Sequence, residues 1–389
     1  MGISETRDYE VFTLAPPRSY HIPMRESAVP ATSDFDNVVP LVPVKGAGLP
    51  AQAGLYPELR YMGSKKRLLP WIFEIFNTLD FDSAMDPFSG TGSVGYLLKS
   101  MGKRVVASDF LNFTSLVATA TIENNNVRLD GKAIKRLIDP TPPDASFIET
   151  TFADVFYTRD DLQFLDRISG NIRRLEGRHE KALAYAALFR SCLKRQPRGV
   201  FTISGNLDHY DDGRRDLRLS LEEHFLEQIE VYNNAVFDNG RRNAASQGDV
   251  FDASDRKIDL VYLDPPYVPR SDDNCYVKRY HFLEGLSAYW EGMPIDESTK
   301  VKKIAKKYTP FSYRKTAVDA FDRMFSKFQK SIIVLSYSSN GFPDLAELER
   351  LMRKYKRDVR VFEKPHRYHF GTHKNVERAS VLEYLVVGQ

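Results

Sequence analysis

The chain contains Ile258-Asp259-Leu260-Val261-Tyr262-Leu263-Asp264-Pro265-Pro266-Tyr267, an apolar run that ends in an acidic residue and two prolines. A short, nearly continuous apolar run is typical of a strand buried on both faces of a parallel sheet. Proline fixes its own backbone angle and donates no backbone hydrogen bond, so the pair ends the strand and stiffens the turn. The stretch therefore predicts an α/β protein with a rigid, polar turn at the carboxyl end of a central strand.

Other strand patterns before and after this run predict the rest of the sheet. Short apolar or β-branched runs end at Asp86 and Asp109 and recur near residues 331–335, 358–362 and 381–387. The first two, joined by a glycine-rich turn and a helix, form a βαβ unit. We expect a Rossmann-like sheet of seven mostly parallel strands, with helices on both faces and an antiparallel final strand after residue 363.

Composition divides the chain into three regions. Residues 1–54 contain many prolines in no regular period, which predicts an extended N-terminal arm. Residues 127–243 have a mainly helical pattern, and we interpret the apolar stripe of this region as core: Ala182, Leu183, Ala186, Phe189 and Leu193. Because this helical stretch interrupts the strand pattern, we expect it to be inserted into an α/β domain made of residues 55–126 and 244–389.

A glycine-rich turn follows the first strand, in the sequence Asp86-Pro87-Phe88-Ser89-Gly90-Thr91-Gly92-Ser93-Val94-Gly95. Glycines between a strand and a helix N-terminus let the backbone approach a ligand closely. The pattern alone also fits a dinucleotide oxidoreductase or a plain structural turn, and Asp109 suits a ribose hydroxyl in either type of ligand. Asp86 favours a different cofactor, because its carboxylate repels a pyrophosphate and attracts the ammonium of a methionine moiety.

The turn at 264–267 has the groups needed to methylate a nucleobase amine. Such an amine is a poor nucleophile because its lone pair is delocalised into the ring, so the site must accept hydrogen bonds from both amine hydrogens. The Asp264 carboxylate and the Pro265 carbonyl can be these acceptors, and Pro266 helps to hold them still. Tyr267 can stack on a base extruded from a duplex, an interaction worth about 1–3 kcal/mol.

The basic residues of the chain are clustered, although the net charge is only +3. Residues 300–315 contain seven Lys or Arg and no acid, and residues 194–218 contain six more. A charged run is often only a solvated face, yet two such runs around a nucleotide-type fold favour a polyanionic partner. We expect phosphate contacts from Lys194, Arg195, Arg198, Arg214, Arg215, Lys302, Lys303, Lys306 and Lys307.

Further features argue against other classes of protein. No apolar run approaches the roughly 18 residues of a membrane span and the start lacks a signal-peptide pattern, so we expect a cytoplasmic protein. Cys192 and Cys275 match no metal or redox spacing, and we interpret them as buried, inert thiols. His366, His369 and His373 lack Cys or carboxylate partners at metal-ligand spacing, so we expect no metal and interpret their loop as a phosphate contact.

Several motifs together resemble, in one order, the adenine-specific DNA methyltransferases of the α class, particularly the FokI-type and Dam-type enzymes. The resemblance covers roughly residues 56–389. Arg60-Tyr61-Met62-Gly63-Ser64-Lys65 resembles the N-terminal cofactor motif of that class, and residues 86–92 resemble its first cofactor loop. Gln247-Gly248-Asp249-Val250 resembles the segment whose acid binds the cofactor's adenine amine, and residues 264–267 match the catalytic loop. Agreement in order is more specific than any single match.

The resemblance implies an enzyme that transfers a methyl group from S-adenosylmethionine to the exocyclic amine of adenine at specific sites in double-stranded DNA, by base flipping and without a covalent intermediate. It implies that residues 127–243 recognise the target, and that residues 279–286 either close over the flipped base or only pack as a helix. The implied catalytic residues are Asp264, Pro265, Pro266 and Tyr267. The implied cofactor-binding residues are Tyr61, Met62, Gly63, Lys65, Asp86, Pro87, Phe88, Ser89, Gly90, Thr91, Gly92, Asp109, Phe110, Asp249, Val250 and Asp264.

The resemblance also implies a biological setting: the modification enzyme of a restriction-modification system, monomeric or weakly dimeric, with a cognate restriction endonuclease as a candidate partner. Three alternatives stay open. Methylation of the cytosine amine poses the same chemical problem, although such enzymes often carry Ser in place of Asp264. Methylation of RNA adenine favours Asn at that position and needs no large insertion. An inactive DNA-binding specificity subunit is the third, and the intact Asp264 and Tyr267 argue against it.

Overall fold

The computed structural model describes residues 48–143, 145–202, 204, 213–268, 275–307, 309–367 and 380–389. The predicted N-terminal arm lies outside the described residues up to position 47, and so do His369 and His373. The last residues of that arm enter a short 3-10 helix, η1 (Ala51–Leu55). From η1, the Gln52 amide donates a hydrogen bond of 3.0 Å to the hydroxyl of Tyr96 in α2 (Ser93–Ser100), so this end of the arm packs against the sheet domain.

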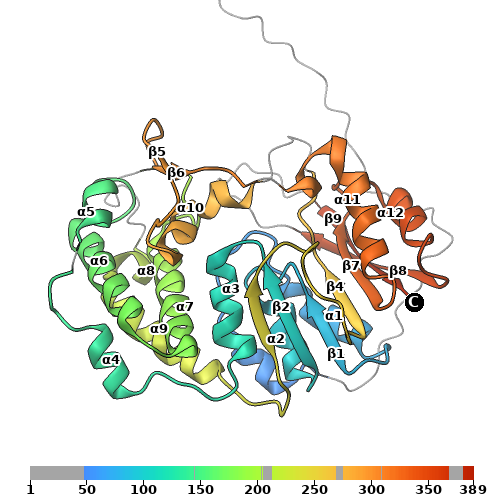
Figure 1. Ribbon diagram of the computed structural model, residues 1–389, viewed down its shortest axis with the longest axis horizontal. Coiled ribbons are helices and arrows are strands. Elements are labelled where there is room, and N and C mark those ends of the chain that lie inside the picture. The colour runs from blue at the N-terminus through green and yellow to red at the C-terminus, as the bar shows by residue number, and fades with distance from the viewer. Residues whose placement is uncertain are drawn as a thin grey trace, which may run out of the picture. The chain divides into compact units, whose positions relative to one another are not determined.

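Seven strands form one sheet in the order β3-β2-β1-β4-β7-β9-β8 (Figure 1). The strands are β1 (Ser83–Asp86), β2 (Arg104–Asp109), β3 (Ala244–Gln247), β4 (Leu260–Leu263), β7 (Ile332–Ser338), β8 (Val359–Arg367) and β9 (Ser380–Gly388). All neighbours pair in parallel except β9, which is antiparallel to both β7 and β8. The predicted fold, a seven-stranded and mostly parallel Rossmann-like sheet with an antiparallel final strand, is confirmed.

Three acidic residues meet at the carboxyl edge of this sheet. Asp86 is the last residue of β1, Asp109 is the last residue of β2, and Asp264 directly follows β4. Strand β1 lies between β2 and β4, and parallel neighbours end at the same edge. The sheet topology alone therefore brings together acids that are up to 178 positions apart, since 264 − 86 = 178.

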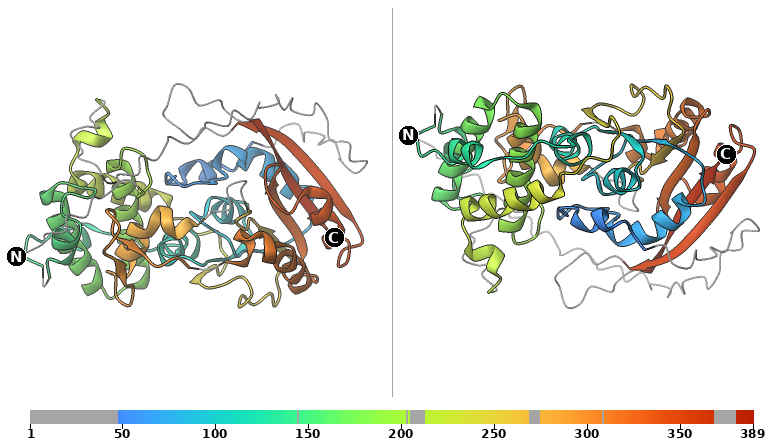
Figure 2. Two further views of the ribbon diagram at one scale, coloured as in Figure 1. Left: turned by 90° about the horizontal axis from the view of Figure 1, so that it is seen from above. Right: turned by 90° about the horizontal axis from the view of Figure 1, so that it is seen from below.

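Alternate residues of the strands pack against opposite layers of helices. In β4, Leu260 and Tyr262 belong to the core that contains α1 (Leu69–Phe76) and α2, whereas Val261 and Leu263 belong to the core with α11 (Arg314–Lys327) and α12 (Leu345–Met352). Figure 2 shows the blue N-terminal helix and the orange C-terminal helices on opposite sides of the sheet. All four β4 side chains are at most 1% exposed, and burying one apolar side chain contributes about 1.5–3 kcal/mol. Burial on both faces explains why this run has no polar alternation.

Residues 127–243 are mainly helical, as predicted. The helices are α4 (Gly131–Leu137), α5 (Phe147–Thr151), α6 (Arg159–Arg174), α7 (Arg178–Arg195), α8 (Arg215–Arg218) and α9 (Leu221–Ala235). The sequence specifies several of their starts: the Thr158 side chain caps α6, and Ser220 and Glu223 form a capping box on α9. Each such cap stabilises a helix by roughly 1 kcal/mol.

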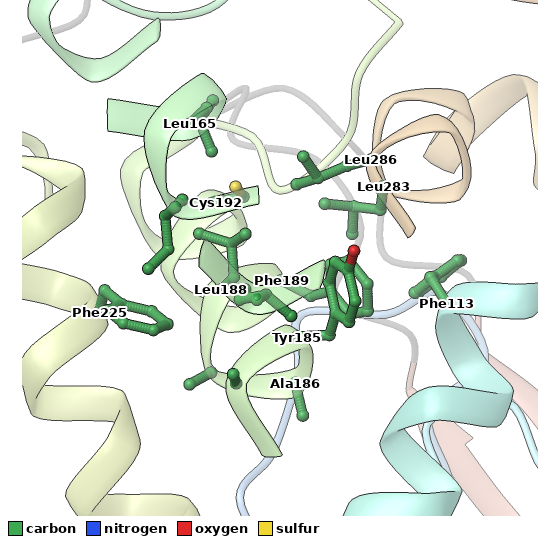
Figure 3. Packing of buried hydrophobic residues seen from close by; sticks show 14 of the residues in the cluster. Phe113, Leu165, Tyr185, Ala186, Leu188, Phe189, Cys192, Phe225, Leu283 and Leu286 are labelled. Atoms are coloured by element: carbon green, nitrogen blue, oxygen red, sulfur yellow. The ribbon is translucent and has the colours of Figure 1, made fainter. Parts of the chain in front are cut away.

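The predicted apolar stripe of α7 is confirmed as core. Its side chains meet Leu165 of α6 and Phe225 of α9 on one side, and Phe113 of α3 (Asn112–Ala118) and Leu283 of α10 (Tyr276–Ser287) on the other (Figure 3). The helical region therefore shares one continuous core with α3 and α10, and α3 in turn lies against β2 (Figure 1).

Short elements complete the described chain. They are the 3-10 helices η2 (Lys66–Leu68) and η5 (Pro310–Ser312), a π-helical turn at Thr119–Glu123, and a two-stranded antiparallel sheet of β5 (Ile295–Asp296) and β6 (Lys303–Ile304). Across the residues that the structure describes, no helix combines the length and the apolarity that a membrane crossing requires.

Candidate active site

One cavity lies at the carboxyl edge of the sheet and is called here the active-site cavity. It is lined by residues from the turn at 61–65, the glycine turn at 86–91, the ends of β2 and β3, and the turn after β4. Every predicted cofactor-binding residue except Gly92 lines it. Of the predicted catalytic residues, Asp264 and Pro266 line the cavity, whereas Pro265 and Tyr267 do not. The structure thus joins the two motifs, at 86–92 and 264–267, on which the sequence interpretation depends.

Asp264 is held by a lysine that the sequence interpretation assigned to the cofactor. Lys65 Nζ lies 2.9 Å from Asp264 Oδ1, and the Lys65 side chain is only 8% exposed. Burial raises the pKa of the Asp264 carboxyl, and the Lys65 ammonium lowers it in part. A buried ammonium at this distance holds one carboxylate oxygen in place and favours the ionised form of the carboxyl group.

Asp86 has an incomplete set of hydrogen-bond partners. Its side chain is buried, and Oδ1 has no hydrogen-bond partner among the residues that the structure describes. Burial raises the pKa of the Asp86 carboxyl well above its usual range, and the carboxylates of Asp264 and Asp109 raise it further. A buried, unpaired carboxylate oxygen is costly, so this atom is a strong acceptor for a donor from a ligand.

Asp109 is already used as a structural acceptor. Its Oδ2 accepts a hydrogen bond of 2.7 Å from the Gly90 amide, and its Oδ1 accepts bonds from the Leu111 amide (2.9 Å) and the Thr114 hydroxyl (2.8 Å). Burial raises the pKa of this carboxyl, and these three donors oppose the rise. Asp109 therefore fastens the glycine turn to the end of β2, in addition to lining the active-site cavity.

Two glycines let the backbone form the wall of the cavity. Gly63 and Gly90 have φ values of +79° and +49°, which favour glycine. A Cβ atom added to Gly90 would lie 3.2 Å from Cε1 of Tyr61, and one added to Gly63 would lie 3.2 Å from the Tyr276 hydroxyl. The Tyr61 ring therefore packs directly against the backbone at Gly90, and the Tyr276 hydroxyl packs against the backbone at Gly63.

Three tyrosines from distant parts of the chain form a stack beside these turns. The Tyr61 ring lies 4.7 Å from Tyr280 at 21° and 5.5 Å from Tyr276 at 28°, measured between ring centroids. The Tyr280 hydroxyl accepts a hydrogen bond of 2.7 Å from the Met62 amide. Sequence reasoning missed Tyr276, which lines the cavity and begins α10. The only signal was its place just before residues 279–286, the segment interpreted as closing over a base or packing as a helix.

The remaining motif residues take distinct places. The turn after β3 is attached to β2, because the Gly248 amide donates to the Asp109 carbonyl at 2.9 Å, and this attachment brings Asp249 and Val250 to the cavity. The Tyr267 ring lies edge-on to Tyr337 of β7, with 5.6 Å between centroids. Tyr267 therefore does not line the active-site cavity, although the residue before it, Pro266, does.

The predicted DNA-contacting residues are dispersed. Lys194 and Arg198 line a second cleft, Arg215 pairs with Glu227, and Lys302 pairs with Glu297. Other predicted contacts also have defined places: Arg214 donates to the Pro197 carbonyl, Lys303 lies in β6, and Lys306 is exposed.

Three residues do not fit their predicted roles. Arg195 is 8% exposed and lies 3.0 Å from the buried carboxylate of Asp161, so it stabilises the helical region and is withdrawn as a phosphate contact. Lys307 lines the active-site cavity and pairs at 2.8 Å with Glu284, which is fully buried. The predicted burial is confirmed for Cys192 but wrong for Cys275, which is partly exposed and lines the cavity.

Comparison with known proteins gives a consistent assignment. A model of the D12 class N6 adenine-specific DNA methyltransferase family matches residues 61–340. The Type II methyltransferase M2.HphI of Haemophilus parahaemolyticus is 30% identical over 344 residues, which cover 85% of this chain and 98% of that protein. The Type II methyltransferase M.FokI of Planomicrobium okeanokoites and the modification methylase StsI of Streptococcus sanguinis are each 25% identical, over 84% and 82% of this chain. The chain spans about half the length of these last two, 52% and 50%. The family model covers most of the chain and every motif from Tyr61 to Tyr267, so the chain belongs to the D12 class N6 adenine-specific DNA methyltransferase family.

Proposed function

We propose that the chain transfers a methyl group from S-adenosylmethionine to the exocyclic amine of an adenine that is flipped out of double-stranded DNA. The observation that supports this most is the shared cavity, in which the ion-paired carboxylate of Asp264 and the glycine turn at 86–91 line the same space. A donor and an acceptor amine must be adjacent for direct transfer, and a common cavity at the strand ends meets that requirement.

The residues around the cavity fit this cofactor. The unpaired Oδ1 of buried Asp86 suits the ammonium of the methionine moiety. Phe88 and Phe110 offer aromatic surface, and Asp249 and Val250 come from the strand end that is suited to the adenine amine of the cofactor. S-adenosylmethionine, when bound, supplies an electrophilic methyl group on a sulfonium.

The residues of the turn after β4 prepare the target amine. Lys65 holds Asp264 Oδ1, which leaves Oδ2 to accept a hydrogen bond from the amine. The Pro265 carbonyl is the second acceptor in the proposal, and the two prolines keep both acceptors in place. Tyr267 stacks on the extruded base. Accepting both hydrogens directs the nitrogen lone pair out of conjugation with the ring, so the amine can attack the methyl group directly.

We propose a separate role for each region of the chain. Residues 55–126 and 244–389 form the catalytic domain, and residues 127–243 recognise the target sequence. Exposed cations of the 302–306 loop and of the 194–215 segment bind phosphates, with Arg195 and Lys307 excluded for the reasons given above. The names of the relatives, a Type II methyltransferase and a modification methylase, support a restriction-modification role, with a restriction endonuclease acting on the same site as the proposed partner.

The test is to map methylated bases in DNA from cells that express the wild type or Asp264→Ala, by single-molecule sequencing. We expect N6-methyladenine at one recognition sequence with the wild type and almost none with the variant. Calorimetry should show that the variant still binds S-adenosylmethionine, since Lys65 and the glycine turn remain. Methylated cytosine instead of adenine, or substantial methylation by Asp264→Ala, contradicts the proposal.

A further inference from the structure

A second cleft lies behind the turn that forms one wall of the active-site cavity. Tyr61, Met62, Gly63 and Ser64 line both spaces, so only this turn separates them. The second cleft encloses about 680 Å³, against about 120 Å³ for the active-site cavity. Its walls are the segment at 54–67 on one side and residues of α7 with the segment at 198–200 on the other. We call it the basic cleft because of the charges that line it.

Cations dominate the lining of the basic cleft. Among the described residues that line it, there are six Lys or Arg and one histidine, His366, but a single carboxylate, Glu58. The whole chain, by contrast, is nearly balanced, with 55 Lys and Arg against 52 Asp and Glu. The excess is therefore local, and a concave surface of one sign of charge attracts a ligand of the opposite sign. The six cations are Arg60, Lys66, Arg67, Arg190, Lys194 and Arg198.

Several of these cations can exchange their present partners for a phosphate. Arg67 is exposed and makes no hydrogen bond or ion pair within the described ranges. Lys66 pairs with Glu58, and both side chains are more than two-fifths exposed. Arg60 shares the Asp216 carboxylate with Lys194. Solvent-exposed pairs contribute only about 0–1 kcal/mol, so a phosphate can replace a carboxylate at little cost.

The walls that carry the cations are fixed by backbone contacts. Arg190 of α7 donates a hydrogen bond of 2.9 Å to the Glu58 carbonyl, which ties the helical region to the segment at 54–67. Gly199 has a φ of +66°, and a Cβ at that position would lie 3.2 Å from Cβ of Arg60. The two walls are therefore held in fixed positions, so the cations can bind a ligand without a rearrangement of the backbone.

We propose that the basic cleft binds the sugar-phosphate backbone of the DNA strand next to the flipped adenine. The proposal rests on the function proposed above. It adds Arg60, Lys66, Arg67 and Arg190 to the phosphate contacts, none of which the charge runs in the sequence identified. DNA fits better than an acidic protein segment, because the turn at 61–64 separates the cleft from the cavity that contains Asp264. A DNA strand bound in the cleft is therefore separated from the reacting base only by this turn, so the strand and the base can belong to the same DNA molecule.

The test compares two double variants that remove the same charge. Lys66→Gln/Arg67→Gln changes the basic cleft, and Arg256→Gln/Lys257→Gln changes two exposed cations before β4, at the opposite edge of the sheet from Asp264. Binding of a fluorescently labelled random-sequence duplex is measured by anisotropy from 50 to about 300 mM KCl. Incorporation of a radiolabelled methyl group into plasmid DNA is measured for the wild type in parallel.

The slope of log K against log salt is negative, and each phosphate contact contributes about −0.9 to it, so we expect the cleft variant to make the slope less negative by about one to two units. The control variant should keep the wild-type slope, and both should bind S-adenosylmethionine as the wild type does. A wild-type protein that methylates DNA, combined with an unchanged slope in the cleft variant, overturns the cleft proposal and leaves the proposed function intact. A wild-type protein that neither binds nor methylates DNA overturns both.

If the double variant fails to fold, Arg67→Gln alone provides the test. Its side chain makes no hydrogen bond or ion pair within the described residues, so the substitution removes charge without removing a polar contact. The slope should then become less negative by about one unit. An unchanged slope contradicts the proposal.

Discussion

Replacing Asp86 by asparagine should stabilise the protein without cofactor and weaken its binding of cofactor. The Asp86 carboxylate is buried and lies near two other carboxylates, and its Oδ1 has no hydrogen-bond partner in the described part of the chain. A neutral amide of nearly the same shape removes the charge and the repulsion. The substitution should therefore raise stability and lower cofactor affinity at the same time, because the atom that destabilises the empty site is also the proposed acceptor for the ligand.

The size of the effect follows from the cost of the buried, unsatisfied oxygen. An unpaired buried group costs about 1–3 kcal/mol when it is neutral and more when it is charged. The asparagine amide is as buried as the carboxylate but carries no charge, so the free energy of unfolding of Asp86→Asn should exceed that of the wild type by about 1–3 kcal/mol near pH 7. The loss of a hydrogen bond to a charged group is worth about 1.5–3 kcal/mol, so the dissociation constant of S-adenosylmethionine should rise roughly 10- to 100-fold.

The pH dependence gives a second measurement of the same effect. Burial raises the folded-state pKa of Asp86, so the folded protein binds this proton more tightly than the unfolded chain does. The wild type therefore loses stability as pH rises from about 4, the unfolded value, through the raised folded value. The asparagine variant lacks this titration, so its advantage should grow from pH 5 to pH 8 in urea unfolding experiments.

Asp109→Asn is the matched control, because the same substitution at the end of the next strand should have the opposite sign. The Asp109 carboxylate accepts three hydrogen bonds, and an amide can replace only one of its two oxygens as an acceptor. This variant should unfold at a lower urea concentration than the wild type. A loss of stability in cofactor-free Asp86→Asn, or cofactor binding as tight as in the wild type, refutes the reasoning about Asp86.

Three other substitutions examine separate contacts. Lys65→Met removes the cation that lowers the pKa of Asp264, so the acidic limb of the methylation pH–rate profile should move to higher pH, and Lys65→Arg should restore much of it. Arg195→Met breaks a buried pair with Asp161 and should lower the free energy of unfolding by about 3–5 kcal/mol in urea titrations, without changing the salt slope of DNA binding in protein that stays folded. Tyr280→Phe removes a buried hydrogen bond to the turn at 61–64 and should cost about 1 kcal/mol of stability in the same titrations.

Much of the active-site cavity was predictable because strong apolar runs and acidic residues coincide in the sequence. The runs that end at Asp86, Asp109 and Asp264 read as strands without any knowledge of their neighbours. Once they are assumed to be parallel, their carboxyl ends must lie at one edge, whatever the length of chain between them. Proximity of the acids thus follows from local pattern and one rule of topology.

Strand β3 was not predictable from the same signal. Its sequence is Ala-Ala-Ser-Gln, and only Ala245 is buried, because it lies at the edge of the sheet. An edge strand buries less side-chain surface than a central one, so its residues need not be apolar or β-branched. The segment after it was found from its resemblance to a family motif, and not from a strand pattern.

The direction of charged side chains was the weakest inference. A run of cations does not show which of them face solvent, and successive residues of a helix point about 100° apart. In α7, Lys194 lines the basic cleft, whereas the adjacent Arg195 is buried with Asp161. The tyrosine stack was missed for a related reason: Tyr61 and Tyr280 are more than 200 positions apart, and no periodicity joins them.

Electrostatics decides between cofactors where the glycine pattern cannot. The pattern at 90–95 fits a pyrophosphate-binding turn, which relies on a helix N-terminus and backbone amides to attract an anion. Here Asp86, Asp109 and Asp264 line the same space, and burial raises the pKa of all three. Lys65 offsets the charge of one of them, and Lys307 is already paired with Glu284. A surplus of buried carboxylates repels a pyrophosphate and favours a ligand that carries an ammonium and a sulfonium. The acids at the strand ends therefore distinguish between the two classes of cofactor, whereas the glycines do not.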